Sequence, residues 1–429
     1  MKKASVITLG CSKNLVDSEQ VLFQLEKNGY EIEHNGSYEN KDIVLVNTCG
    51  FIQDAKQESI DLILDLIKAK KEGSIKDIRV FGCLSERYRE ELKAEIPEID
   101  QYYGTYELEK IYSDLRLKTT KNTLERRILT GASHYAYVKI SDGCDRTCSF
   151  CAIPLIKGKH RSRPMESILA ECKYLANKGT KEIILIAQDL SYYGLDLKEK
   201  HLLAELVEKI SEINGIEWIR MHYLYPARFP YDILEVMKTN PKVCKYIDLA
   251  LQHVSDNQLN LMRRNINKAE TIKLVKTIKK EVPDIALRTT MLVGHPGETQ
   301  QDFEELIEFI EDVKFDRLGG FTYSAEDNTF ADEEYENDVP DDEKQNRFNK
   351  MMDVQQNISN LNNQSKIGKI FKVIIDKEDN EYFIGRTEFD SPEVDNEVLI
   401  GKENNLKIGE FYPIKITSSD DFDLYGELD

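Results

Sequence analysis

The chain has 429 residues, and its 58 Lys and Arg against 77 Asp and Glu give a formal net charge of −19. Hydrophobic residues make up 41% and charged residues 31% of it, a composition typical of folded domains that excludes general disorder. One hydrophobic core seldom supports so long a chain, so we expect two or three domains. The acidic balance disfavours direct nucleic-acid binding through phosphate contacts and favours a basic partner.

No segment approaches the run of about 18 apolar residues that a membrane span needs, so we expect no membrane partner. The opening Met1-Lys2-Lys3 and ASVITLGC contain too short an apolar run for a secretion signal. Eight cysteines in such a chain therefore indicate a reducing, cytoplasmic location, where thiols serve metals or catalysis rather than disulfides.

Short apolar runs alternate with amphipathic helical patterns over residues 1–118. The pattern predicts strands at Val6–Leu9, Ile43–Val46 and Ile78–Phe81, with helices at Ser18–Lys27 and Gln57–Lys71. Strands that alternate with helices are typical of a parallel sheet. We therefore predict a small parallel α/β N-terminal domain over residues 1–118.

A longer alternation follows the charged stretch Lys118–Arg127. Strands are predicted at Ala136–Ile140, Glu182–Ala187, Trp218–His222, Tyr246–Leu251, Ile285–Val293 and Arg317–Tyr323. Helices are predicted between them, at Met165–Asn177, Leu202–Ile213 and Gln300–Val313 among others. Six successive βα units predict a complete or partial parallel barrel, (β/α)6, over residues 130–363, with function at the carboxyl ends of its strands.

The composition changes again after the barrel. The segment Asp332–Glu343 holds eight acidic residues; we expect a loop that contacts either a substrate or only solvent, followed by an exit helix over Glu343–Asn363. Residues 364–429 then alternate strand-like segments with Gly and acidic turns, at Ile370–Ile375, Tyr382–Thr387, Glu397–Ile400 and Phe411–Ile416. This pattern predicts a C-terminal antiparallel β barrel.

Three cysteines lie at the spacing CxxxCxxC in DGCDRTCSFCAIP, directly after the first predicted barrel strand. They are Cys144, Cys148 and Cys151, and three soft thiolates so close together favour a metal site over simple burial in a core. No fourth Cys or His follows at short spacing, which disfavours closed structural zinc. An iron-sulfur cluster held by three thiolates leaves one iron open to bind a reagent.

A second set of cysteines lies in the N-terminal domain, in the pairs Gly10-Cys11, Cys49-Gly50 and Gly82-Cys83. Each pair follows the carboxyl end of a predicted strand, and these ends share one edge of a parallel sheet. The three thiols can therefore converge, and the glycines suit turns that bring backbone close to a cluster. The alternative is three cysteines buried as small apolar residues, as we expect for Cys172 and Cys244.

The CxxxCxxC motif, with the aromatic Phe150 before its last cysteine and a βα barrel around it, resembles the radical S-adenosylmethionine superfamily. That resemblance implies that the open iron binds S-adenosylmethionine, whose reductive cleavage yields a 5′-deoxyadenosyl radical. The cofactors then supply the difficult chemistry, and the protein positions them.

The whole chain resembles the methylthiotransferases, and within them the branch that modifies a ribosomal protein. The matching segments are GCSKNLVDSE, VNTCGFI, GCLSERY, KISDGCDRTCSFCAIPLIKGKHRSRP, AQDLSYYG, LQHVSD, LRTTMLVGHPGET and SPEVD. Two residues depart from the family pattern, Ala250 where proline is expected and His295 where phenylalanine is expected.

The resemblance implies two 4Fe-4S clusters. Cys11, Cys49 and Cys83 hold an auxiliary cluster that supports sulfur delivery, and the CxxxCxxC set holds the radical-generating one. The implied reaction inserts SCH3 at the β carbon of an aspartate in small-subunit ribosomal protein S-twelve, free or in the ribosomal subunit. It requires an electron donor and a sulfur source as further partners.

Several polar residues at predicted strand ends are expected to point toward the barrel mouth and to hold S-adenosylmethionine or the substrate. They are Gln188, Asp189, Gln252, His253 and Arg288. The segment GHPGE from Gly294 resembles the superfamily segment along the adenine, although a Gly-Pro pair is also typical of a tight turn. The basic run Lys157–Arg163 is either a solvated loop or part of the functional rim.

Charge separates a protein substrate from an RNA substrate. Residues 364–429 hold 8 Lys or Arg and 16 Asp or Glu, a balance of 8 − 16 = −8. This segment resembles a TRAM domain, and an acidic one favours docking onto a basic ribosomal protein. Two alternatives stay open: a tRNA adenosine methylthiotransferase, and a non-catalytic iron-sulfur electron carrier or redox sensor.

Overall fold

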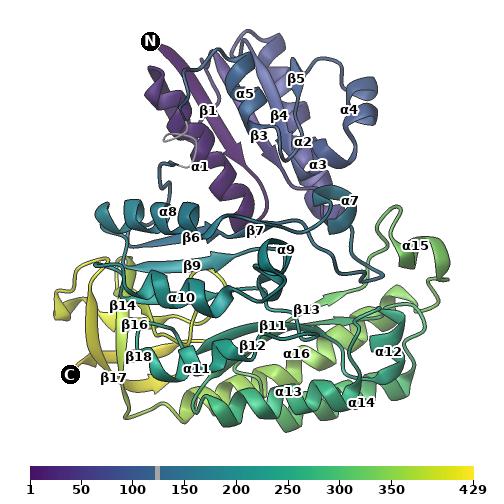
Figure 1. Ribbon diagram of the computed structural model, residues 1–429, viewed down its shortest axis with the longest axis vertical. Coiled ribbons are helices and arrows are strands. Elements are labelled where there is room, and N and C mark those ends of the chain that lie inside the picture. Colours follow the sequence, from purple (N-terminus) through teal and green to yellow (C-terminus); the bar gives the residue numbers. More distant parts are fainter. Residues whose placement is uncertain (121–125) are drawn as a thin grey trace.

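The computed structural model describes residues 1–120 and 126–429, so part of the charged stretch 118–127 lies outside the described residues (Figure 1). An α/β unit at the N-terminal end lies above a central βα barrel, and a small β barrel lies at the left of the central barrel (Figure 1). None of the described helices combines the length and apolar character needed to span a membrane.

The N-terminal unit is a five-stranded parallel sheet in the order β2-β1-β3-β4-β5. Its strands are β1 Lys2–Thr8, β2 Tyr30–His34, β3 Ile43–Thr48, β4 Ile78–Gly82 and β5 Gln101–Tyr102. Its helices are α1 Ser12–Lys27, α2 Gln53–Lys71, α3 Cys83–Arg87, α4 Arg89–Glu95 and α5 Leu108–Asp114. The three predicted strands are confirmed. The edge strands β2 and β5 escaped the prediction because β2 is polar and partly exposed and β5 has only two residues.

The central unit contains two three-stranded sheets of parallel strands, β10-β9-β6 and β11-β12-β13. The strands are β6 Tyr135–Lys139, β9 Glu182–Ile186, β10 Trp218–Met221, β11 Tyr246–Gln252, β12 Ala286–Val293 and β13 Arg317–Thr322. An isolated bridge between Leu224 and Leu249 joins the two halves. Within the described residues β6 and β13 do not pair, so the predicted barrel is the partial form.

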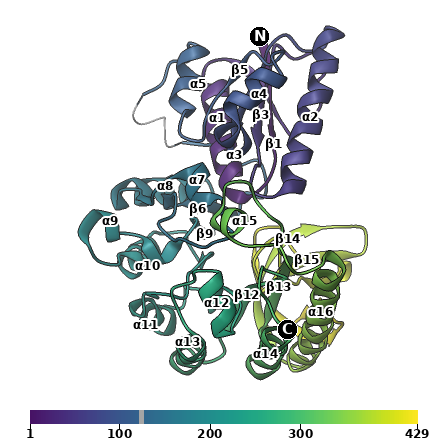
Figure 2. The same cartoon turned by 90° about the vertical axis from the view of Figure 1, so that its right-hand side faces the viewer.

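Helices cover the outside of this barrel (Figure 2). The longer ones are α8 Met165–Asn177, α10 Leu203–Ser211, α11 Asp232–Thr239, α13 Lys268–Glu281, α14 Gln300–Val313 and the exit helix α16 Asp341–Gln364. Shorter elements are α7 Ile153–Lys157, α9 Leu195–Lys198, α12 Asp256–Leu261, α15 Phe330–Glu334, β7 Ser141–Asp142 and β8 Arg161–Ser162. The acidic segment was predicted to begin as a loop. That prediction is wrong for Asp332–Glu334, which belong to α15; this helix starts after Thr329, whose backbone is extended.

The C-terminal unit is a closed barrel in the order β14-β15-β16-β18-β17. Its strands are β14 Ile370–Glu378, β15 Tyr382–Arg386, β16 Val398–Gly401, β17 Phe411–Ser419 and β18 Leu424–Leu428. The predicted barrel is confirmed, with two corrections. The strand β18 was missed because most of its residues are partly or fully exposed, and it pairs with β16 in parallel rather than antiparallel fashion.

A buried charge network joins the C-terminal barrel to the amino ends of the central strands. Glu182 at the start of β9 accepts from Arg220 at 2.8 Å and pairs with Arg386 of β15 at 2.5 Å. All three side chains are essentially inaccessible to solvent. The C-terminal barrel therefore closes the end of the central barrel that is opposite to the carboxyl ends of its strands.

Replacement of this buried acid gives a stability prediction. Glu182→Gln leaves the buried Arg220 guanidinium without its carboxylate partner, while Arg386 keeps Asp376 at 2.6 Å. We expect the free energy of unfolding to fall by about 3–5 kcal/mol. Urea denaturation at pH 7 measures this loss. Glu217→Gln, in an exposed pair with Lys372, is the matched control and should change stability by no more than about 0.5 kcal/mol.

The stability contributed by Glu182 is expected to depend on pH. Burial raises the pKa of Glu182, but the charges of Arg386 and Arg220 outweigh it, so its net pKa lies below its usual value. The stabilisation is therefore present above the unfolded-state pKa and is lost as the pH falls through the lowered folded-state pKa. The difference between wild type and Glu182→Gln should shrink in that acidic range, and a difference that is constant with pH would contradict the charge interaction.

Candidate functional site

The N-terminal cysteines lie at one edge of their sheet. Cys11, Cys49 and Cys83 directly follow or closely follow the carboxyl ends of the adjacent strands β1, β3 and β4. Their loops touch, since a Cβ added at Gly10, where φ is +87°, would lie 2.9 Å from the Cys49 Sγ. The three thiols are also close enough for their charges to interact. The fold thus brings this predicted set together.

Buried amides tie the three cysteine loops to each other. The Asn14 Nδ2 donates to the carbonyl oxygens of Leu9 at 2.9 Å and Thr48 at 3.2 Å. The Asn47 Nδ2 donates to the Asn14 carbonyl at 2.8 Å, and the Thr48 hydroxyl donates to the Phe81 carbonyl at 2.7 Å. Asn14 and Asn47 were not predicted from the sequence; the available signal was an amide within three residues of Cys11 and of Cys49.

The three thiols have different electrostatic surroundings. Burial raises the pKa of Cys83 to about 12, and burial also raises the pKa of Cys49. Burial acts in the same direction on Cys11, but the Lys13 ammonium and nearby backbone N–H groups outweigh it and lower the net pKa of Cys11. At Cys83 the charge of Lys157 does not outweigh burial. Because a metal ligand must be the thiolate, iron at this site would supply the further positive charge that favours it.

The barrel cysteines lie on the loop between β7 and α7. The Cys144 N–H donates to the Gly158 carbonyl at 3.1 Å, and the Cys151 N–H donates to the Cys148 carbonyl at 3.2 Å. Each of the three side chains is half-buried, and their charges interact. Backbone hydrogen bonds thus fold the CxxxCxxC motif into one compact loop.

Distant residues donate to the sulfur atoms of this loop. The Cys148 Sγ accepts from the Arg264 Nη1 at 3.1 Å and lies 3.4 Å from the Tyr225 hydroxyl oxygen. The Cys144 Sγ accepts from the Arg146 backbone N–H at 3.4 Å. Hydrogen bonds to the sulfurs are one way in which proteins set the reduction potential of a cluster. Sequence reasoning missed Arg264 and Tyr225 because only the fold brings them to the loop.

The donor set fits clusters better than single ions. Within residues 1–120 and 126–429, no three Cys, His, Asp or Glu side chains converge tightly enough for one metal ion. A cluster offers a separate iron to each thiolate, so its ligands lie further apart than those of a single ion. Three soft thiolates in each set without a further protein ligand suit iron-sulfur clusters that keep one iron open.

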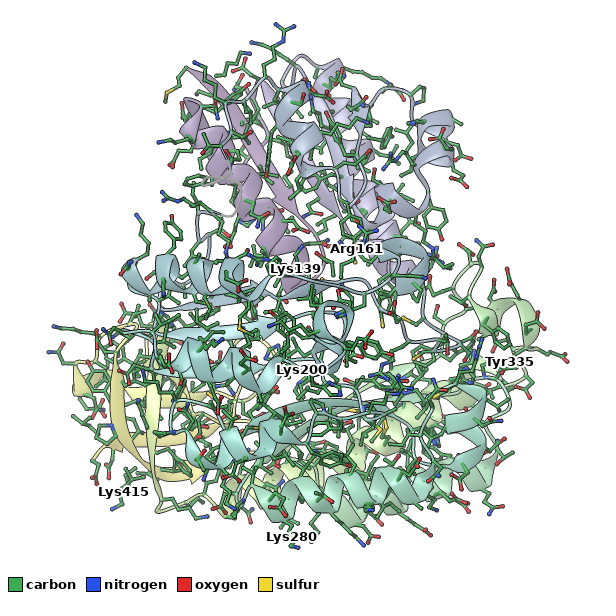
Figure 3. All side chains as sticks on the ribbon, in the orientation of Figure 1. Lys139, Arg161, Lys200, Lys280, Tyr335 and Lys415 are labelled. Carbon is green, nitrogen blue, oxygen red and sulfur yellow. The ribbon has the colours of Figure 1, made fainter. Side chains whose placement is uncertain are left out.

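The two cysteine sets face each other across the boundary between the N-terminal unit and the barrel. Helix α3, which begins at Cys83, lies beside α7 (Figure 2), and Cys83 packs with Ala152 and Ile156 in one buried cluster. Lys139 also crosses this boundary, where Figure 3 labels it, through an ion pair with Asp17 at 2.6 Å. The N-terminal cysteines therefore adjoin the barrel at the helix that follows its cysteine loop.

The basic run Lys157–Arg163 divides between the two interpretations given above. Lys157 is buried, and its charge acts on the thiols of Cys83 and Cys11. His160 is buried as well, whereas Lys159 and Arg161 are exposed. One part of the run thus belongs to the cysteine site and the other part is a solvated loop.

Three of the residues expected to contact S-adenosylmethionine lie at carboxyl ends of barrel strands. Gln252 ends β11, Gly294 follows β12, and Gln188 follows β9, with an Oε1 that has no hydrogen-bond partner among the described residues. Phe150 and Gln252 line a cavity of about 320 Å³ between the barrel mouth and the N-terminal unit. Asp189 and His253 are instead engaged by Arg146 at 2.7 Å and by Glu298 at 3.0 Å. Their contacts are therefore structural.

The expected location of Arg288 is wrong. This residue is the third of β12, five positions before the carboxyl end of the strand. Its guanidinium pairs with Asp248 and with Asp395 of the C-terminal unit, at 3.3 Å each. Because β12 spans the barrel from end to end, its early residues lie far from the barrel mouth. Arg288 is one of these, and it neutralises two carboxylates near the C-terminal unit.

The two departures from the family pattern have local explanations. His295 packs edge to face with Phe150, Tyr323 and Tyr335 at ring distances of 6.2, 5.2 and 6.0 Å, and burial lowers its pKa to about 4. It is thus a neutral aromatic group, as phenylalanine would be. The Ala250 N–H donates to the Leu224 carbonyl at 3.0 Å, a bond between the half-barrels that proline could not make.

Family profiles match three parts of the chain. The Radical SAM superfamily matches residues 138–310, the Uncharacterized protein family UPF0004 residues 3–104, and the TRAM domain residues 367–428. The first of these matches implies S-adenosylmethionine and a 4Fe-4S cluster as cofactors. Solved structures share the fold, including the methyltransferase TsrM from Kitasatospora setae, with a TM-score of 0.56 and 13% identity over 77% of this chain and 74% of that one.

Curated relatives match over the full length. Each is described as a ribosomal protein uS12 methylthiotransferase RimO. The relative from Phocaeicola vulgatus is 54% identical over 99% of this chain and 98% of its own, and the one from Porphyromonas gingivalis is 53% identical over 99% of both. The relative from Cytophaga hutchinsonii is 51% identical over 99% of this chain and 98% of its own. The chain therefore belongs to the RimO family of radical S-adenosylmethionine methylthiotransferases.

Proposed function

We propose that this enzyme inserts a methylthio group at the β carbon of an aspartate in ribosomal protein uS12 and uses two 4Fe-4S clusters to do so. The observation that carries the proposal is the packing of α3, which begins at Cys83, against α7, which directly follows the barrel cysteine loop. A radical formed at one site and sulfur held at the other would then meet in a single space. Cluster-bound S-adenosylmethionine, when present, supplies the radical that removes hydrogen from the substrate.

The residues of the chain have separate tasks in this proposal. Cys144, Cys148 and Cys151 hold the radical-generating cluster, and Cys11, Cys49 and Cys83 hold the auxiliary cluster. Phe150, Gln188, Gln252 and Gly294 position the S-adenosylmethionine. Arg264 and Tyr225 tune the first cluster through the Cys148 sulfur.

The proposed organisation follows the same logic. Residues 1–118 form the sulfur-delivering domain, residues 130–363 the radical-forming barrel with its exit helix, and residues 364–429 the TRAM-like domain. Separate buried clusters of the N-terminal sheet, the central barrel and the C-terminal barrel support these boundaries.

A protein substrate, an electron donor and a sulfur source are the proposed partners, and a reducing cytoplasm is the proposed location. All eight cysteines are free thiols, as a reducing compartment requires. The C-terminal domain carries the charge of −8 described above, and such a surface attracts a basic protein and repels RNA. We accordingly do not propose direct nucleic-acid binding.

Mass spectrometry of intact ribosomal proteins from cells with and without the gene tests the proposal. We expect the deletion to remove the mass of one methylthio group from uS12 and to leave methylthio-adenosine in tRNA unchanged. If tRNA lost its modification and uS12 kept its mass, the enzyme would be the tRNA-modifying alternative. If neither changed, a carrier or sensor role would gain support.

A variant at Arg264 tests the proposed tuning of the radical-generating cluster. Arg264→Met removes a buried cationic donor from the Cys148 sulfur. A cluster gains one negative charge when it is reduced, and the arginine charge stabilises that reduced state. We expect a more negative reduction potential, seen in an EPR-monitored redox titration, and slower formation of 5′-deoxyadenosine by about tenfold. Arg89→Met, which breaks partly exposed pairs with Glu107 at 2.8 Å and Glu86 at 3.6 Å, is the control. An unchanged potential would contradict the tuning role.

A further inference from the structure

A polar groove runs along the outside of the cluster loop. Two cavities of about 670 and 710 Å³ adjoin there and share Asn265 and Ile266. Asp145 and Arg146 line the first cavity and Thr147 lines the second, so the segment between two cluster cysteines forms a wall of both. We call the residues around these two cavities the cluster-loop groove.

The groove lies one hydrogen bond from a proposed cluster ligand. The Arg146 N–H that donates to the Cys144 Sγ at 3.4 Å belongs to a residue of the groove wall. The Arg146 guanidinium packs 3.9 Å from the centre of the Tyr225 ring, and the Tyr225 hydroxyl in turn contacts Cys148. A protein seated in the groove would therefore lie beside the cluster without entering the barrel.

The groove adjoins a basic surface on an acidic protein. Helix α13 holds five lysines and two glutamates, a balance of 5 − 2 = +3, although the whole chain is at −19. Lys273 lines the groove, and Lys276 and Lys280 continue its charge along the helix. All three are exposed, and within the described residues none forms an ion pair. Figure 3 shows Lys280 at the outer edge of the molecule.

The acidic residues of the groove are engaged in local structure. Asp145, Asp256 and Glu270 accept hydrogen bonds from the backbone N–H groups of His160, Lys268 and Asn267, at 2.9, 2.7 and 3.0 Å. The cationic groups are less engaged. Arg228 on the rim is exposed. Arg146 pairs with the buried Asp189 through its Nε at 2.7 Å, and its buried Nη2 lacks a hydrogen-bond partner in the described chain. The groove thus offers donors and positive charge to an acidic ligand.

Three residues of the groove have an uncommon backbone conformation. Arg228, Arg263 and Asn265 have φ values of +57°, +55° and +55°, in the left-handed region that side chains rarely adopt, and all three line the two cavities. Such conformations cost free energy and persist where the surroundings require them, often at functional sites.

We propose that the cluster-loop groove and the α13 lysines form the docking surface for an acidic one-electron carrier protein that reduces the radical-generating cluster. One electron passes from the carrier to the cluster, so the carrier is oxidised by one electron and the cluster is reduced by one; no covalent bond changes in this step. The inference rests on the proposed cluster at Cys144, Cys148 and Cys151. Ribosomal RNA would also be attracted by the lysines, but phosphate binding gains nothing from proximity to the cluster.

The test uses the reconstituted holoenzyme and the triple variant Lys273→Glu, Lys276→Glu and Lys280→Glu. An acidic plant-type ferredoxin is the carrier probe. We expect its Kd to rise by at least about tenfold and the salt dependence of binding to weaken. Formation of 5′-deoxyadenosine driven by reduced ferredoxin should fall in parallel, whereas formation driven by dithionite, which needs no protein docking, should be unchanged.

The matched control replaces three exposed lysines of the N-terminal domain by glutamate. They are Lys68, Lys71 and Lys93, whose side chains are 73%, 67% and 48% exposed. It should retain wild-type ferredoxin binding and turnover. Wild-type ferredoxin affinity in the α13 variant would overturn the proposal, and so would an equal loss with both reductants, which indicates structural damage. Loss of ribosomal-subunit binding with intact ferredoxin-driven turnover would show that the face binds RNA instead.

These outcomes are separate from those of the proposed function. If the wild-type enzyme formed no 5′-deoxyadenosine with dithionite, the proposed radical-generating cluster would be wrong. If it did so but left uS12 unmodified, only the substrate proposal would fail. The docking proposal is decided by the ferredoxin Kd and by the comparison of the two reductants, neither of which requires uS12.

Discussion

Replacement of Cys148 by serine is expected to abolish 5′-deoxyadenosine formation, with a loss of more than about a thousandfold. Cys148 is the most heavily supported sulfur of its loop, with Arg264 and Tyr225 both in contact. Serine keeps the size of the side chain but removes the soft ligand, so the cluster would lose one of its three anchors. High-performance liquid chromatography of the reaction with S-adenosylmethionine and dithionite measures the loss, and iron content per chain should fall alongside it.

Cys172→Ala is the matched control for this experiment. Cys172 is inaccessible to solvent and packs within the hydrophobic core of the barrel. Its removal should cost about 1 kcal/mol of stability through a small cavity and should leave the iron content and 5′-deoxyadenosine formation unchanged. Activity retained by Cys148→Ser, or lost equally by Cys172→Ala, would contradict a ligand role for Cys148.

Replacement of Cys49 by serine is expected to separate the two halves of the reaction. Cys49 belongs to the N-terminal set, where its charge interacts with those of Cys11 and Cys83. The auxiliary cluster would be lost, and we expect about half of the bound iron to disappear, because each proposed cluster holds an equal share. Reductive cleavage of S-adenosylmethionine should persist, since the barrel cysteines are intact, whereas uS12 should gain no methylthio group.

Three measurements on the Cys49→Ser variant distinguish the possible outcomes. Mössbauer spectroscopy counts the clusters, chromatography measures 5′-deoxyadenosine, and mass spectrometry measures the modified uS12. If Cys49→Ser kept full iron content and full methylthio transfer, the N-terminal cysteines would be packing residues and the enzyme would have one cluster. If the variant lost 5′-deoxyadenosine as well, the two sites would not be independent.

Much of this site could be predicted from the chain because its groups are local in sequence. The motif Cys144, Cys148 and Cys151 lies within one loop, so spacing alone indicates soft-metal chemistry. The N-terminal set required one further rule, that neighbouring parallel strands end at a shared edge, and β1, β3 and β4 are indeed neighbours. Strands with strong apolar runs were placed within a few residues, whereas exposed strands such as β2 and β18 were missed because they bury too little apolar surface to leave a pattern.

Contacts between distant residues were decided only by the tertiary structure. No periodicity indicates that Arg264 reaches Cys148 or that Asn14 bridges two cysteine loops. The misplacement of Arg288 has the same origin, because the sequence shows a polar residue within a strand but not which end of the barrel it faces.

The sequence by itself therefore determined the order of the folded units, the placement of six cysteines after strands and the family, since these depend on residue type and on spacing along the chain. The tertiary structure decided that the two cysteine sets adjoin through α3 and α7, that the C-terminal barrel closes the opposite end through Glu182, and that a basic groove lies beside the cluster loop. These features depend on how separate elements pack in three dimensions, and packing joins residues that no local pattern connects.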